Sequence, residues 1–160
     1  MSEVEVNFRS SLHEITVRLT GTALRTIEKN SLAAGSHETG GILIGSYDLE
    51  GRTATVSEAT TKSIDSRAGR TWFQRGVRGL SDILRLRWSI GQYYVGEWHS
   101  HPGGAPEPSM NDIREMQAVS KEFSYQCPRP IMIIAGTEKT GIVKLSASVM
   151  KDGVLIRLVG

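Results

Sequence analysis

The sequence predicts a mixed α/β or α+β fold, in which helices pack on a mixed β-sheet. Two observations carry this prediction. Segments with alternating apolar residues are interleaved with segments whose apolar residues recur at helical spacing. The length of 160 residues also suits one domain over residues 1–160. A hydrophobic content of 39% and a charged content of 22% indicate a globular chain with a core rather than a disordered one.

Strands dominate the first half of the chain. Alternating or continuous apolar residues predict strands over residues 4–8, 15–19, 40–47 and 53–59. A helix is expected over residues 21–34, where Leu24 and Ile27 follow helical spacing and Gly35 provides a stop. Residues 60–74 are polar and predict a long loop, and a loop of that length in a compact domain is often functional.

The second half alternates helices and strands. An amphipathic helix is expected to end near Gly91. Its buried face would be formed by Val77, Leu80, Leu84 and Trp88. A weakly amphipathic helix is expected over residues 109–121, after the Pro/Gly-rich residues 102–108. Strands are predicted over residues 93–98, 131–135, 142–149 and 154–159.

The stretch EWHSHPGGAPEPSMND, residues 97–112, carries the side chains best suited to chemistry. His99 and His101 lie at the end of a predicted strand, two residues apart, so they should point to the same face. Asp112 follows the Pro/Gly-rich loop, at the start of a predicted helix. Two imidazoles and one carboxylate leave a coordination position open, as in catalytic zinc sites, and the same set also suits non-haem iron(II).

The sequence leaves two possible roles each for Ser109, Asp112 and Glu38. Ser109 and Asp112 have the spacing of a helix capping box, which leaves the second oxygen of Asp112 able to bind a metal. Glu38, in HETGG before a predicted buried strand, is a candidate general base for a metal-activated water. The alternative for Glu38 is an exposed glutamate in a loop.

Glu38, HSHP at residues 99–102, Ser109 and Asp112 together resemble the JAMM signature, E…H-x-H-P-x6-S-x2-D. This signature belongs to the JAB/MPN/Mov34 metalloprotease family, and every position of it is present. The resemblance implies the MPN/JAB fold, a curved mixed sheet with packed α-helices. The glycines Gly40 and Gly41 would let the backbone run close to the site.

The same resemblance assigns a role to each residue of the signature. One Zn²⁺ per chain would be held by His99, His101 and Asp112. The ion would activate a water molecule and polarise the scissile carbonyl. Glu38 would accept the proton of the water and pass it to the leaving amine, and Ser109 would donate a hydrogen bond to the developing oxyanion.

Local motifs resemble the short bacterial branch of the family encoded beside E1- and E2-like enzymes in CBASS antiphage operons. These motifs are FQRG at 73–76, GEWH at 96–99 and P-x-P-S at 106–109. The implied activity is a zinc-dependent isopeptidase that releases the C-terminus of a cGAS-like nucleotidyltransferase or a ubiquitin-like protein from a target. The alternatives are a JAB peptidase that processes a carrier or ubiquitin-like protein outside CBASS, and a non-catalytic MPN interaction module.

Composition argues against several other classes. The single cysteine, Cys127, cannot form an internal disulfide and is expected to be a small buried residue. The longest apolar run, residues 131–135, is too short to cross a membrane, and the N-terminus lacks the features of a signal peptide. A cytoplasmic location is therefore expected. A net charge of +2 is too weak to indicate nucleic-acid binding.

The middle of the chain is rich in arginine and holds two adjacent aromatic residues. Trp72 and Phe73 are expected to anchor the core, the alternative being side chains that flank a substrate tail. The arginines are expected on a solvated surface, with a phosphate-binding surface or a docking face for an acidic partner as alternatives. They are Arg67, Arg70, Arg75, Arg78, Arg85 and Arg87.

Overall fold

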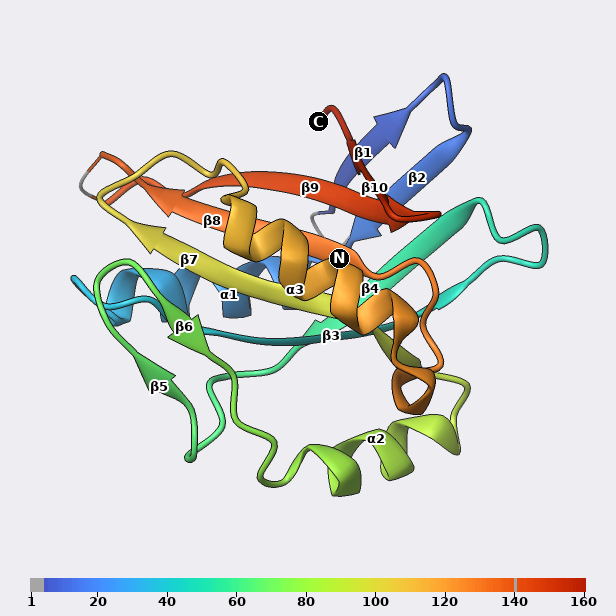
Figure 1. The fold of residues 1–160 in the computed structure, drawn as a ribbon, viewed down its shortest axis with the longest axis horizontal. Coiled ribbons are helices and arrows are strands. Elements are labelled where there is room, and N and C mark those ends of the chain that lie inside the picture. Colours follow the sequence, from blue (N-terminus) through green and yellow to red (C-terminus); the bar gives the residue numbers. More distant parts are fainter. Residues whose placement is uncertain (1–4, 140) are drawn as a thin grey trace.

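The computed structural model describes residues 5–139 and 141–160, and a mixed eight-stranded sheet dominates it (Figure 1). Its strands are β1 (Val6–Ser10), β2 (Ile15–Leu19), β3 (Gly40–Tyr47), β4 (Thr53–Ala59), β7 (Tyr93–Pro102), β8 (Ile131–Thr137), β9 (Lys144–Lys151) and β10 (Val154–Arg157). They are ordered β1-β2-β4-β3-β7-β8-β9-β10. The pairs β2–β4 and β7–β8 are parallel and the others are antiparallel.

The sheet curves until its two edges approach each other. Arg9 of β1 and Val159, beyond β10, exchange two backbone hydrogen bonds of 2.8 Å. The mixed, curved sheet expected from the sequence is thus confirmed. The first expected strand included Val4, which lies outside the described residues, and the strand expected over 142–149 instead spans Lys144–Lys151.

Helices cover both faces of the sheet. They are α1 (Gly21–Ala33), α2 (Leu80–Trp88), α3 (Met110–Lys121) and the short 3₁₀ helix η1 (Phe123–Tyr125). In Figure 1, α1 lies behind the sheet and α3 in front of it. Consecutive strand residues alternate between two cores: Leu43 packs in the core with Ile27 of α1, and Ile42 packs in the core with Met116 of α3.

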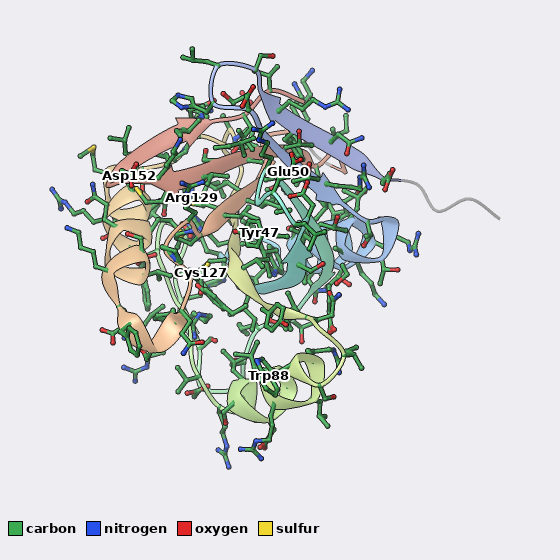
Figure 2. All side chains as sticks on the ribbon, turned by 90° about the vertical axis from the view of Figure 1, so that its right-hand side faces the viewer. Tyr47, Glu50, Trp88, Cys127, Arg129 and Asp152 are labelled. Carbon is green, nitrogen blue, oxygen red and sulfur yellow. The ribbon has the colours of Figure 1, made fainter. Side chains whose placement is uncertain are left out.

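Helix α2 differs from its expected form. It begins at Leu80, after Gly79 with φ of 84°, and not at Val77. The carboxylate of Asp65 accepts the backbone amides of Val77 at 3.0 Å and Arg78 at 3.1 Å, which holds these residues outside the helix. The expected buried face is wrong at its two ends, because Val77 is 66% exposed and Trp88, labelled on α2 in Figure 2, is 69% exposed.

The polar segment over residues 60–74 is also more regular than expected. It contains a small second sheet of two antiparallel strands, β5 (Arg67–Ala68) and β6 (Phe73–Gln74). We call residues 67–74 the β5–β6 hairpin. No helix among residues 5–139 and 141–160 is long and apolar enough to cross a membrane.

Candidate active site

His99 and His101 lie near the end of β7. This strand was expected to end at Trp98. Its parallel pairing with β8 continues to the pair Pro102–Thr137, so both histidines are part of the strand. The centroids of the two imidazole rings are 5.1 Å apart, and His99 is buried. The alternation of side chains along the strand therefore brings the two imidazoles together.

Asp112 reaches the histidines from the first turn of α3. Ser109 is the N-cap: its Oγ accepts the amide of Asp112 at 3.1 Å, and the Asp112 carboxylate accepts the amide of Ser109 at 2.8 Å. The same carboxylate lies 3.0 Å from Nε2 of His99 and 3.3 Å from Nε2 of His101. The capping box and the approach to the histidines thus coexist. Burial opposes ionisation of Asp112, but the histidines and the Ser109 amide outweigh it and hold its pKa well below the usual value.

Glu38 comes to the same place from the residues before β3. Its side chain is buried and is therefore not the exposed loop glutamate considered as the alternative. Its backbone amide donates to the carbonyl oxygen of Gly69 at 2.8 Å, which ties it to the β5–β6 hairpin. Burial raises the pKa of the Glu38 carboxyl above its ordinary value, and the two histidines partly oppose this rise.

Two glycines at the start of β3 allow the strand to pack tightly beside the site. A Cβ on Gly40 would lie 2.2 Å from the carbonyl oxygen of Trp98 and 2.9 Å from Cβ of His99. A Cβ on Gly41 would lie 2.3 Å from the carbonyl oxygen of Thr60. Side chains at these positions would push β3 away from β7 and β4.

Two features of the imidazoles suit metal binding. Nδ1 of His101 is 3.2 Å from the carbonyl oxygen of Ala105, a contact that orients the ring with Nε2 towards Asp112. Among the described residues, Nε2 of His99 is buried without a hydrogen-bond partner, although an Asp112 oxygen is 3.0 Å away. Ligand atoms bonded to tetrahedral zinc are separated by about 3.3 Å, close to the distances found here.

Glu38, His99 and His101 also offer ligand atoms that lie within 4.8 Å of one another. The site can therefore hold a metal ion with the two histidines and a carboxylate. Asp112 lies 3.0 Å from Nε2 of His99 and 3.3 Å from Nε2 of His101, so two carboxylates approach the same pair of imidazoles.

A cleft of about 280 Å³ opens onto this cluster. Asp112, Ser109 and Glu115 line one side, and Trp72, Phe73 and Arg70 of the β5–β6 hairpin line the other. Trp72 is 50% exposed, so the expectation that it anchors the core is wrong, and Phe73 is only partly buried. Both aromatic residues line the cleft, and the alternative that they flank a substrate tail stays a prediction.

A buried ion pair beside the site was missed from the sequence. Nε of Arg75 donates to Oε1 of Glu97 at 2.5 Å, and the two side chains are 13% and 12% exposed. Arg75 and Arg87 are therefore exceptions to the solvated surface expected for the arginines, since Arg87 pairs with Glu58 at 2.7 Å. An acidic residue inside an apolar strand was the available signal for Glu97. Cys127 is buried, as expected.

Comparisons with known proteins identify the family of the chain. Residues 22–148 match the model of a family described as prokaryotic homologs of the JAB domain. A protein of Enterobacter hormaechei subsp. hoffmannii, named "CD-NTase/cGAS isopeptidase", is 50% identical over 153 residues, which cover 96% of this chain and 85% of that protein. A Pseudomonas aeruginosa protein of the same name is 30% identical over 117 residues, covering 71% of this chain and 73% of that protein.

The fold also matches a solved structure. A solution structure of a Desulfitobacterium hafniense protein superposes with a TM-score of 0.65 at 18% identity, covering 87% of each chain. At that identity the likeness concerns the fold alone. The resemblance to the JAB family noted in the sequence is confirmed by the family match and by the two relatives.

Proposed function

Because the chain belongs to the family of prokaryotic JAB-domain homologues, we propose that it is a zinc-dependent isopeptidase that detaches a cGAS-like nucleotidyltransferase (CD-NTase) from conjugated proteins. One observation carries the proposal: His99, His101, Asp112 and Glu38 converge at a cleft, where the buried Nε2 of His99 has no hydrogen-bond partner within residues 5–139 and 141–160. The names of the two relatives supply the substrate class.

His99, His101 and Asp112 would hold one Zn²⁺. When bound, the ion would polarise the scissile carbonyl and increase the acidity of a water molecule. The hydrogen bond from His101 to Ala105 and the capping box at Ser109 keep two of the three ligands oriented, and such supporting contacts commonly tune metal sites. Neutral imidazoles and an ionised carboxylate are the protonation states that ligation requires.

Glu38 would act as the proton carrier. Its carboxylate accepts a proton as the water oxygen bonds to the amide carbon, and the same proton goes to the amine nitrogen as the C–N bond breaks. The products are a free C-terminal carboxylate and a lysine amine. The burial that raises the pKa of Glu38 makes it a better base than an exposed glutamate. Ser109 would stabilise the oxyanion through its hydroxyl proton.

The hydrolysis would counteract conjugation by E1- and E2-like enzymes in bacterial antiphage defence. An isopeptide-linked tail is an extended chain, and the cleft between α3 and the β5–β6 hairpin is open to one. A ubiquitin-like protein is a second substrate of the same chemistry, since it would also present a C-terminal tail. We place the reaction in the cytoplasm, where such conjugates form.

The test compares two isosteric variants. Glu38→Gln should lower kcat by about 10²- to 10⁴-fold while retaining one zinc per chain, because it removes a proton acceptor and no ligand. Asp112→Asn should lose most of its zinc as well as its activity. Zinc content is measured by plasma mass spectrometry, and cleavage is measured on a CD-NTase joined to a lysine side chain. Glu50→Gln, on the exposed turn after β3, is the matched control and should behave as wild type.

The substrate is identified by placing Glu38→Gln on the chromosome of the host. Lysine-linked adducts of a CD-NTase should then accumulate relative to wild type in a proteomic comparison. If an unprocessed carrier protein accumulates instead, and no conjugate changes, the isopeptidase assignment fails. Full activity in Asp112→Asn would contradict the proposed ligand set.

A further inference from the structure

The ion pair between Arg75 and Glu97 lies where β7, the end of the β5–β6 hairpin and η1 meet. Glu97 is on β7, two residues before His99, and Arg75 directly follows β6. Tyr125, in η1 just after α3, accepts a hydrogen bond of 2.7 Å from Nη2 of Arg75. The guanidinium therefore connects the strand that carries the histidines, the hairpin that carries Trp72, and the segment that follows the helix of Asp112.

The surroundings leave the guanidinium little freedom. Its Nη1 donates to the carbonyl oxygen of Gly76 at 3.0 Å, and its Cζ lies 6.0 Å from the centroid of the Tyr125 ring. Tyr94 donates to the other oxygen of Glu97, and its ring centroid is 4.9 Å from that of Tyr125. Both carboxylate oxygens and all three guanidinium nitrogens thus have partners.

A bulge in β7 makes this arrangement possible. Leu43 of β3 pairs with Gly96, but the next residue, Ile44, pairs with Tyr94, so Val95 is an extra residue. The extra residue brings Tyr94 and Glu97, three apart in sequence, to the same face. Without the bulge, strand alternation would point them to opposite faces.

The β5–β6 hairpin needs attachment from outside itself. It consists of two strands of two residues each, separate from the main sheet, and a hairpin of that size is marginal in water. The Glu38–Gly69 backbone bond attaches it near its start, at 2.8 Å. Arg75 attaches it where the chain leaves β6.

Global stability alone does not explain a buried ion pair here. Replacing such a pair with uncharged residues is often neutral or stabilising, because desolvation offsets the attraction. A forked guanidinium is, in contrast, directional and fixes the relative position of the groups that it joins.

We propose that Arg75 and Glu97 are positioning residues that hold the β5–β6 hairpin as the substrate-facing wall of the cleft. The pair acts on substrate binding through Trp72 and Phe73, and it does not support the metal ligands. The kinetic part of this inference rests on the proposed isopeptidase function, and the hairpin part does not.

The principal variants remove the forked guanidinium of Arg75 without leaving an unpaired buried charge. Arg75→Met/Glu97→Gln removes both charges and retains an acceptor for Tyr94, so it is expected to fold. Arg75→Lys keeps the charge, but one ammonium group cannot reproduce the fork to Glu97 and Tyr125. The matched control is Arg87→Met/Glu58→Gln, which removes a bidentate pair between α2 and β4, with contacts of 2.7 and 3.1 Å, away from the cleft.

The first readout is independent of activity. The chain has three tryptophans, at positions 72, 88 and 98, so 5-fluorotryptophan labelling gives three ¹⁹F resonances that single Trp→Phe variants assign. In the Arg75/Glu97 double variant the Trp72 resonance should move towards the position of the unfolded chain, while the resonance of buried Trp98 stays. In the control, Trp72 should be unchanged. An unchanged Trp72 resonance in the double variant would overturn the inference.

The second readout separates substrate binding from the chemical step. With a CD-NTase tail linked to a lysine peptide, KM should rise by about tenfold or more in the double variant, with kcat changed less than about threefold. Zinc content and the visible spectrum of the Co²⁺-substituted protein should match wild type. A fall in kcat alone, or an altered Co²⁺ spectrum, would show that the pair supports the metal ligands. Either result would overturn the inference. If wild type does not cleave the conjugate, the proposed function fails, and the ¹⁹F experiment still tests the hairpin.

Discussion

At the scale of single residues, Ser109 caps α3, and under the proposed function its hydroxyl group would also donate to the oxyanion. Its oxygen accepts the amide of Asp112 at 3.1 Å, so the lone pair caps α3, and its proton remains available to a group in the cleft. The cap positions Asp112 while the proton would face the reacting carbonyl. The two tasks are separable because only the second needs a donor.

Substitutions at Ser109 should therefore separate the effect on the free energy of unfolding from the effect on kcat. Ser109→Ala loses both the cap and the donor. Its free energy of unfolding should fall by about 1 kcal/mol, and its kcat should fall by about 10²- to 10³-fold. Ser109→Asp retains a capping oxygen but has no proton to donate. It should keep the unfolding midpoint of wild type in urea and still lose at least as much kcat. Wild-type kcat in Ser109→Asp would exclude the donor role.

At the scale of elements, the start of β3 shows how tightly the site is held by its neighbours. The Oγ1 of Thr60 accepts a hydrogen bond of 2.9 Å from the backbone amide of Ile42. The carbonyl oxygen of Thr60 accepts a hydrogen bond of 2.9 Å from Nε1 of buried Trp98. Trp98 directly precedes His99, so Thr60 links β3 to the strand of the histidines. Gly41 is the residue that lets Thr60 come this close.

Gly41→Ala should disturb this link between β3 and β7. The new Cβ would lie 2.3 Å from the Thr60 carbonyl oxygen and 2.5 Å from its Oγ1, both on a backbone segment packed against Trp98. We expect a loss of about 1–3 kcal/mol in the free energy of unfolding, measured by urea denaturation. Gly104→Ala is the control, because its Cβ would meet His101 atoms only at 3.7 Å or beyond. Equal losses in both variants would contradict the steric argument.

At the scale of the whole molecule, the sequence predicts periodic features well and isolated contacts poorly. The main strands and the shared face of His99 and His101 follow from alternation, which is a property of every strand. The β5–β6 hairpin was not predicted because strands of two residues are too short to show a period. The Arg75–Glu97 pair joins residues 22 apart in sequence, and a local sequence pattern does not predict such a contact.

The start of α2 shows how a distant side chain changes an element. Val77 continues the helical spacing, but Asp65 binds its amide and that of Arg78, so the helix begins later. Helix propensity depends on residues close in sequence, so it does not reveal a competing hydrogen-bond acceptor twelve residues away.

Binding of a metal ion at the proposed site would stabilise the whole fold. His99 and His101 come from β7 and Asp112 from α3, so an ion bound by all three would cross-link a central strand to a covering helix. At free zinc about 1,000-fold above the dissociation constant, binding to the folded state alone adds about 4 kcal/mol. For a chain of this size that raises the unfolding temperature by about 8–16 °C.

Calorimetry with and without a chelator should show this difference for wild type and for Glu38→Gln, whose proposed role is not ligation. Asp112→Asn should unfold at about the same temperature in both conditions, because its third ligand is weakened. If Glu38→Gln lost the zinc-dependent shift and Asp112→Asn kept it, the ion would be held by Glu38, His99 and His101 instead. That result would exchange the roles of the two carboxylates, since the one that does not bind the metal is then free to carry the proton.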